Sequence, residues 1–144
     1  MHNLKTIIFA FCFTFTSAVL GADTLKLDGG VFDNVDGSAK IEQVKDGQNK
    51  VTINLDNLKP NSLYTVWLVN EKPEMSMTGL GSGNYSFQTD SEGNGTYTAT
   101  INKGELAKWQ VLKVVLHPDG NPKNMKNIKS AATGDLTKVQ RAAE

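Results

Sequence analysis

The sequence has 144 residues, of which 15 are basic and 15 acidic, so its formal net charge is zero. That balance gives no attraction to a polyanion, and we expect neither nucleic acid nor an anionic membrane surface as a partner. Hydrophobic residues make up 39% of the chain, enough for one packed core.

The first 22 residues have the order of a secretory signal peptide. Lys5 supplies a positive start, residues 7–15 (IIFAFCFTF) form a short apolar block, and small neutral residues follow as far as Ala22. The block is shorter than the about 20 apolar residues that span a membrane, so we expect it to be removed. Cys12 leaves with it. We therefore expect an exported protein, periplasmic or extracellular, with no stable membrane anchor after processing.

Processing leaves about 120 residues with one more acidic than basic side chain, which is the size of a single domain. We place a β-sandwich domain at residues 23–135 and a polar C-terminal tail at residues 136–144. The processed chain contains no cysteine, so its fold must be held by burial and hydrogen bonding without a disulfide.

Apolar residues downstream of the leader recur at every second position, which is the spacing of half-buried strands. The alternating sets are Leu25/Leu27, Ala39/Ile41, Val51/Ile53/Leu55, Tyr85/Phe87 and Tyr97/Ala99/Ile101. Two further runs, residues 63–69 and 111–116, are apolar at both parities. Those two runs predict central strands that are covered on both faces.

Turn residues separate these runs. Asp46-Gly47 predicts a hairpin, Pro60 a corner, residues 90–95 a connection between strands, and residues 133–135 a final turn. A short helix is expected near residues 104–109. Together the spacing predicts an all-β, antiparallel immunoglobulin-like or Greek-key sandwich of about seven or eight strands.

A family resemblance enters at residues 58–69, where a Leu-x-Pro corner leads into the strand Tyr-x-Val-Trp-Leu. A Gly-x-Gly-x-Tyr hairpin ending at Tyr97 and the segment 114–120 (VVLHPDG) follow in a similar order. Residues 58–135 thus resemble the extracytoplasmic domain of anti-sigma-K factors. This resemblance implies a β-sandwich fold. It implies no regulatory activity, because the chain has no sigma-binding segment of that family.

Soft metal ligands are the sharpest candidate for chemistry. Met75 and Met77 are two residues apart, so they project to one side of a strand. Met125 and His117, which is the only histidine after the leader, complete the set. Thioether and imidazole groups suit copper, and these four residues are the candidate metal ligands. Ordinary packing of the methionines is the favoured interpretation, with His117 near solvent at a strand end.

Two other patterns have simpler explanations. Asp90, Glu92 and Asn94 alternate like the opening of a calcium loop, but the expected twelfth-position acid is Ile101. A hairpin turn explains the same residues and is the favoured interpretation. Asn84 and Asn94 also begin glycosylation sequons.

No nucleophile motif accompanies the one remaining histidine, so we expect no catalytic residues and no enzyme. The sequence predicts an exported, non-enzymatic binding or interaction module whose partner is an unidentified protein or small ligand. No cofactor is expected unless the alternative holds, namely a periplasmic copper-binding protein. Its functional surface is expected on the loops at residues 70–84 and 118–129.

Overall fold

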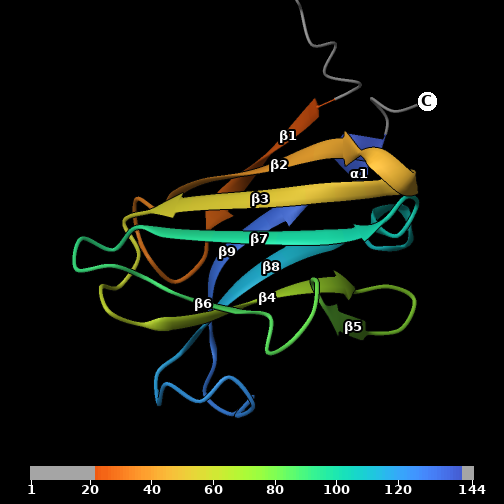
Figure 1. Cartoon of the computed structure of the whole chain (residues 1–144). Coiled ribbons are helices and arrows are strands. Elements are labelled where there is room, and N and C mark those ends of the chain that lie inside the picture. Colours follow the sequence, from red (N-terminus) through yellow and green to blue (C-terminus); the bar gives the residue numbers. More distant parts are fainter. Residues whose placement is uncertain (1–21, 141–144) are drawn as a thin grey trace, which may run out of the picture.

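The computed structural model describes residues 22–140 of the chain (Figure 1). The predicted signal peptide lies outside these residues except for Ala22, which begins the first strand. The described part forms one sheet of nine strands, and every strand pair is antiparallel. The strands are β1 (Ala22–Gly29), β2 (Asp36–Val44), β3 (Gln48–Asp56), β4 (Leu63–Asn70), β5 (Ser76–Gly79), β6 (Ser86–Gln88), β7 (Gly95–Asn102), β8 (Val111–His117) and β9 (Lys129–Asp135). The predicted all-β antiparallel fold is confirmed.

The sheet curls into two layers that enclose the core. Its strand order is β5-β4-β8-β9-β1-β2-β3-β7, with β6 also paired to β4. Figure 1 shows β2, β3 and β7 side by side, with β8 and β4 in the second layer. Leu27 and Ile53 of the first layer belong to the same buried cluster as Val66 and Val114 of the second. The layers are halves of one continuous sheet, because β9 pairs with β1 at their junction.

The alternating runs of the sequence become strands with one buried face. Val51, Ile53 and Leu55 of β3 are buried between exposed or half-exposed neighbours. In β4 and β8, by contrast, adjacent residues such as Tyr64 and Thr65 are both buried. The prediction that these two strands are covered on both faces is confirmed in part, because Trp67 of β4 and Lys113 of β8 are half-exposed.

The predicted hairpin at Asp46-Gly47 joins β2 to β3 through a three-residue 3₁₀ turn, Lys45–Gly47. Gly47 has a φ of +67°, a left-handed conformation that glycine adopts without steric cost. A second 3₁₀ turn, Leu106–Lys108, forms where the short helix was expected. Its Leu106 is buried in the core.

Strands β5 and β6 are two halves of one interrupted edge. β5 pairs with Trp67–Asn70 and β6 with Leu63–Thr65 of β4. Residues 80–85 leave the sheet between them, with Leu80 N and Tyr85 O both bonded to Val66. The region 70–84 was predicted as one loop, and that prediction is wrong for Ser76–Gly79.

Strand β9 was also missed, because residues 133–135 were predicted as a turn. Gly134 instead lies within β9 opposite Leu112. A Cβ atom there would lie 2.6 Å from a methyl group of Leu27 and 2.7 Å from one of Leu25. Glycine therefore permits the close approach of β9 to β1 side chains, which is a packing role that turn statistics do not include.

The segment predicted as a polar tail begins with a core residue. Leu136 is 1% exposed, and its N–H donates to Gln110 O at 2.9 Å. The short helix α1 (Thr137–Gln140) follows, with Val139 packed against the core. The folded unit therefore continues at least to Gln140.

Candidate functional site

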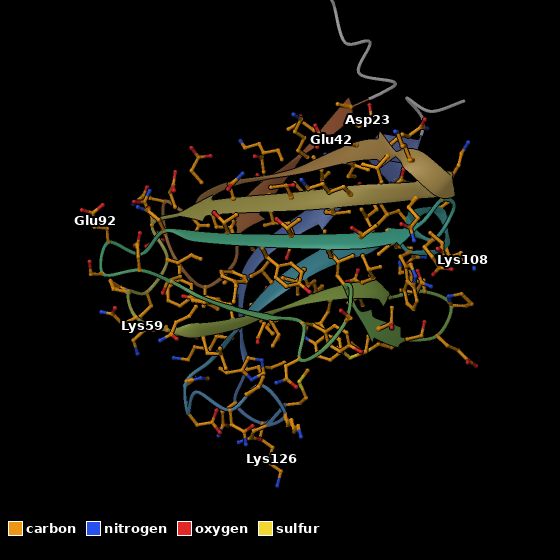
Figure 2. All side chains as sticks on the ribbon, viewed as in Figure 1. Asp23, Glu42, Lys59, Glu92, Lys108 and Lys126 are labelled. Atoms are coloured by element: carbon orange, nitrogen blue, oxygen red, sulfur yellow. The ribbon has the colours of Figure 1, made fainter. Side chains whose placement is uncertain are left out.

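Three connections gather at one end of the two layers. The β3–β4 corner is tied to the β6–β7 turn by Leu58 N, which donates to Gly93 O, and by Asn61 N, which donates to Asp90 O, both at 3.0 Å. It is tied to the β1–β2 loop by Asn57 Nδ2, which donates to Asn34 O at 2.8 Å. Figure 2 shows Lys59 and Glu92 at this end.

Thr89 fixes the shape of the β3–β4 corner. Its hydroxyl donates to Lys59 O at 2.6 Å and accepts the N–H of Ser62 at 3.0 Å. Lys59 N in turn donates to the hydroxyl of Tyr64 at 3.0 Å. Tyr64 is fully buried, and burial raises the pKa of its phenol. The buried hydroxyl groups of Thr89 and Tyr64 thus hold the backbone of this corner in one conformation.

A cleft of about 320 Å³ lies between this corner and the start of the β8–β9 connection. Its exposed polar side chains are Lys59, Asn61 and Gln88, and part of its wall is formed by Pro118 and Gly120. The lining comes from three separate segments of the chain, residues 59–63, Gln88 and residues 116–120, and their convergence required the complete fold. The cleft offers one cation and two amides to a ligand.

A buried hydrogen-bond network lies behind the cleft. Trp67 Nε1 donates to Thr65 Oγ1 at 2.7 Å, and the same oxygen is 2.7 Å from His117 Nε2. His117 Nδ1 is 3.1 Å from Asn124 O. A carbonyl oxygen only accepts, so Nδ1 carries the proton, Nε2 accepts, and the Thr65 hydroxyl donates to it. Each ring nitrogen of His117 then has one partner.

Thr65 Oγ1 and His117 Nε2 are close enough to act as a nucleophile and its base, but both residues are buried. Thr65 is 0% and His117 2% exposed. The Thr65 oxygen also receives the indole N–H of Trp67. His117 is among the residues that line the cleft, but both its ring nitrogens already have partners. The arrangement is therefore suited to holding the structure together.

The network anchors the β8–β9 connection, residues 118–128, which extends from the lower part of the view with Lys126 on it (Figure 2). Within this loop, Asp119 accepts the N–H of Asn121 at 3.0 Å and the side-chain amide of Asn124 at 2.6 Å. The N–H of Asn121, followed by the Asn124 amide, lowers the pKa of the Asp119 carboxyl. Asn124 therefore links the loop's own hydrogen bonds to His117.

The prediction that His117 lies near solvent is wrong. His117 shares a face of the sheet with Val115 and Thr65, as its pairing with Leu63 requires. The β8–β9 loop covers this end of that face, because Asn124 reaches the His117 ring. The sequence did not show that a loop folds over this strand end.

The structure does not bring the four predicted copper ligands together. Met77 pairs with Val69 and His117 with Leu63, at opposite ends of β4. The length of β4 between them is about 20 Å at the usual rise of a strand. Met75 and Met77 are 75% and 43% exposed, and Met125 lies on the β8–β9 loop. Met77 and His117 are therefore too far apart to share one ion, and copper binding by this protein stays a prediction.

The carboxylate of Asp90 is turned toward the backbone. Its Oδ1 accepts the N–H groups of Glu92 and Asn94, both at 2.9 Å. These amides, with that of Asn94 contributing most, lower the pKa of Asp90. The hairpin-turn interpretation of residues 90–94 describes this geometry. In residues 22–140 no three His, Cys, Asp or Glu side chains gather as metal ligands would.

Sequence reasoning missed the residues that shape this end of the molecule, namely Lys59, Thr65, Gln88 and Thr89. The sequence did contain one indication that the hydroxyl of Thr65 is buried, since Thr65 is a lone polar residue inside the apolar run 63–69. A buried hydroxyl needs a hydrogen-bond partner, but the sequence did not identify His117 as that partner.

No protein-family model matches this chain, and no curated protein matches its sequence. Between residues 22 and 140, no helix is long and apolar enough to cross a membrane. The resemblance to the anti-sigma-K domain stays a prediction.

Proposed function

We propose that this protein is an exported, non-catalytic binding module that takes a ligand in the cleft between the β3–β4 corner and the β8–β9 loop. The observation that carries the proposal is the convergence of Lys59, Asn61 and Gln88 on one cleft of about 320 Å³. The backbone around them is fixed by Thr89. A preformed concave site with a few placed polar groups is the usual form of a small-ligand site.

The chemistry of the lining indicates the ligand class. Lys59 is a cation, while the amides of Asn61 and Gln88 both donate and accept hydrogen bonds. A small acidic or amide-rich ligand, such as a carboxylate-bearing peptide end, fits this set. The non-catalytic part of the proposal is supported by the burial of Thr65 and His117.

The test is an NMR titration of the 15N-labelled protein, followed in 1H–15N correlation spectra, with a panel of small carboxylates, amides and short peptides. We expect shifts clustered on Lys59–Leu63, Gln88 and Gly120 for at least one class. The shifts should weaken in Lys59→Ala and Gln88→Ala. Lys50→Ala, on the exposed face of β3, is the matched control. Shifts that ignore the cleft, or that survive both cleft substitutions, would refute the proposal.

A further inference from the structure

Strand β7 forms one edge of the sheet, and its outer side pairs with no strand within residues 22–140. It is eight residues long (GTYTATIN) and contains neither a charge nor a proline. Exposed edges are normally protected by charges, proline, bulges or short length, because unpaired backbone groups recruit other strands. The opposite edge follows this rule, since β5 has only four residues. β7 is a long edge without that protection.

The β3–β7 ladder shows which backbone groups of β7 point outward. Lys103 N donates to Gly47 O at 2.8 Å, and bonded pairs alternate along antiparallel strands. The odd-numbered residues of β7 therefore bond to β3, and the N–H and C=O groups of Thr96, Thr98 and Thr100 point away from it. Thr96 Oγ1 also donates to an asparagine of β3 at 2.9 Å, and side chains lie closest in non-hydrogen-bonded pairs.

This edge is only partly covered: the facing segment touches β7 where the Tyr97 hydroxyl donates to Leu80 O and where Gly81 lies against Ala99. Two hollows of about 320 and 280 Å³ lie along it, lined by β7 residues that include Thr98 and Thr100. The facing segment, residues 79–83, has glycine at three of its five positions. The side chains of all three outward threonines are exposed.

We infer that β7 pairs with β7 of a second copy of this chain, antiparallel, around a twofold axis at Thr98. This register places Thr98 opposite its own counterpart and Thr96 opposite Thr100 of the second copy. The outward groups of the three threonines then make about six hydrogen bonds between the copies. A twofold interface of this kind closes at two copies and leaves neither β7 edge free.

The charges flanking β7 favour a second copy over an unrelated strand. Asp90 and Glu92 precede the strand, while Lys103, Glu105 and Lys108 follow it, and Lys108 is already paired with Glu105 at 2.7 Å. Figure 2 shows Glu92 and Lys108 at opposite ends of β7. Antiparallel pairing brings the acidic turn of each copy to Lys103 of the other. In the register centred on Thr98, Lys103 lies opposite Gly93 of the second copy, next to its Glu92.

The strand itself adds no repulsion to this pairing. Threonine pairs well with threonine across antiparallel strands, and no like charges face one another. The arrangement differs from the proposed ligand cleft, which lies in the other layer, so either proposal can fail without the other.

The first experiment is sedimentation velocity of the purified chain from about 1 µM to 1 mM, a range that covers weak and moderate affinities. We expect the mass to rise from one to two copies. Thr98→Lys places like charges at the twofold axis, and we expect it to weaken the dimer at least about tenfold. Its circular dichroism should be unchanged, since Thr98 is exposed. Lys103→Glu should also weaken the dimer, and adding Glu92→Lys should restore it.

The second experiment is disulfide trapping in a Cys12→Ser background, because Cys12 is the only natural cysteine. Thr98→Cys should oxidise to a covalent dimer, since directly opposed residues have Cα atoms about 5.5 Å apart, within disulfide range. Thr24→Cys, exposed on β1 at the other end of the same layer, is the control.

A protein that stays monomeric over the whole concentration range overturns the inference. So does a dimer that is unaffected by Thr98→Lys, since it would use another surface. Equal trapping of the two cysteine variants has the same meaning. Binding of a synthetic peptide with the sequence 94–103 by a protein that never dimerises would show that β7 takes single strands instead, and it too overturns the twofold pairing.

Discussion

The buried hydroxyl of Thr65 gives the sharpest test of how this fold is held together. Thr65→Val keeps the shape of the side chain and removes the one atom that joins Trp67 to His117. Thr65→Ser keeps that oxygen and removes a methyl group. If packing dominates, Thr65→Ser should lower the free energy of unfolding more than Thr65→Val does. If hydrogen bonding dominates, Thr65→Val should lower it more.

The magnitudes follow from the burial of each partner. His117 is 2% exposed, so loss of the bond to its Nε2 costs about 1–3 kcal/mol. Trp67 is half-buried and regains part of its bond from water. The added methyl group offsets about 0.8 kcal/mol. Thr65→Val should thus destabilise the protein by about 2 kcal/mol, and Thr65→Ser by about 1 kcal/mol.

The assay is urea unfolding followed by far-ultraviolet circular dichroism, with an unchanged m-value as evidence that the denatured state is the same. Thr24→Val, at an exposed position, should change the free energy of unfolding by less than about 0.5 kcal/mol. If Thr65→Val proves no more destabilising than Thr65→Ser, the hydroxyl does not join the two side chains and the reasoning fails.

Three further results are expected. Gly134→Ala should lower the free energy of unfolding by about 1–3 kcal/mol, measured in urea, because its Cβ would overlap two leucines of β1; a neutral effect would contradict the close approach of β9. The pKa of Asp119 is lowered from its ordinary value of 3.8 by amide donors, so its stabilisation is present above that value and lost as the pH falls through the folded-state pKa. Asp119→Ala should therefore make the free energy of unfolding less dependent on pH between about pH 5 and pH 2, and an unchanged slope would be the contrary outcome. In calorimetric Cu(I) titrations, His117→Gln should leave any affinity unchanged, since Met77 lies at the other end of β4; an equal loss in His117→Gln and Met77→Ala would show that they share an ion.

The two strands that the sequence failed to predict have physical reasons in common. β9 (KSAATGD) contains no large apolar residue, so it has no hydrophobic period to detect. Its Ala131, Ala132 and Gly134 are buried because they lie where the curled sheet brings its layers close together. β5 is a short edge strand with exposed methionines. Its pairing with β4 depends on a reversal of the chain between the two strands, which no pattern in its sequence predicts.

The candidate ligands show the same limit. Met75 and His117 were grouped because their chemistry agreed, and the register of β4 separates them. Thr65 and His117 are 52 residues apart, and only the pairing of β4 with β8 makes them neighbours. The cleft beside Lys59 likewise consists of segments that have no local relation to one another.

The amino-acid sequence by itself determined the all-β class, most of the strands and the hairpin at Gly47. These features depend on side-chain alternation and on backbone preferences that act within a few residues. The tertiary structure alone decided the curl of the sheet, the burial of His117, the polar cleft and the free edge of β7. Those properties depend on which distant strands pair and in what register, and that is settled by the packing of the whole core.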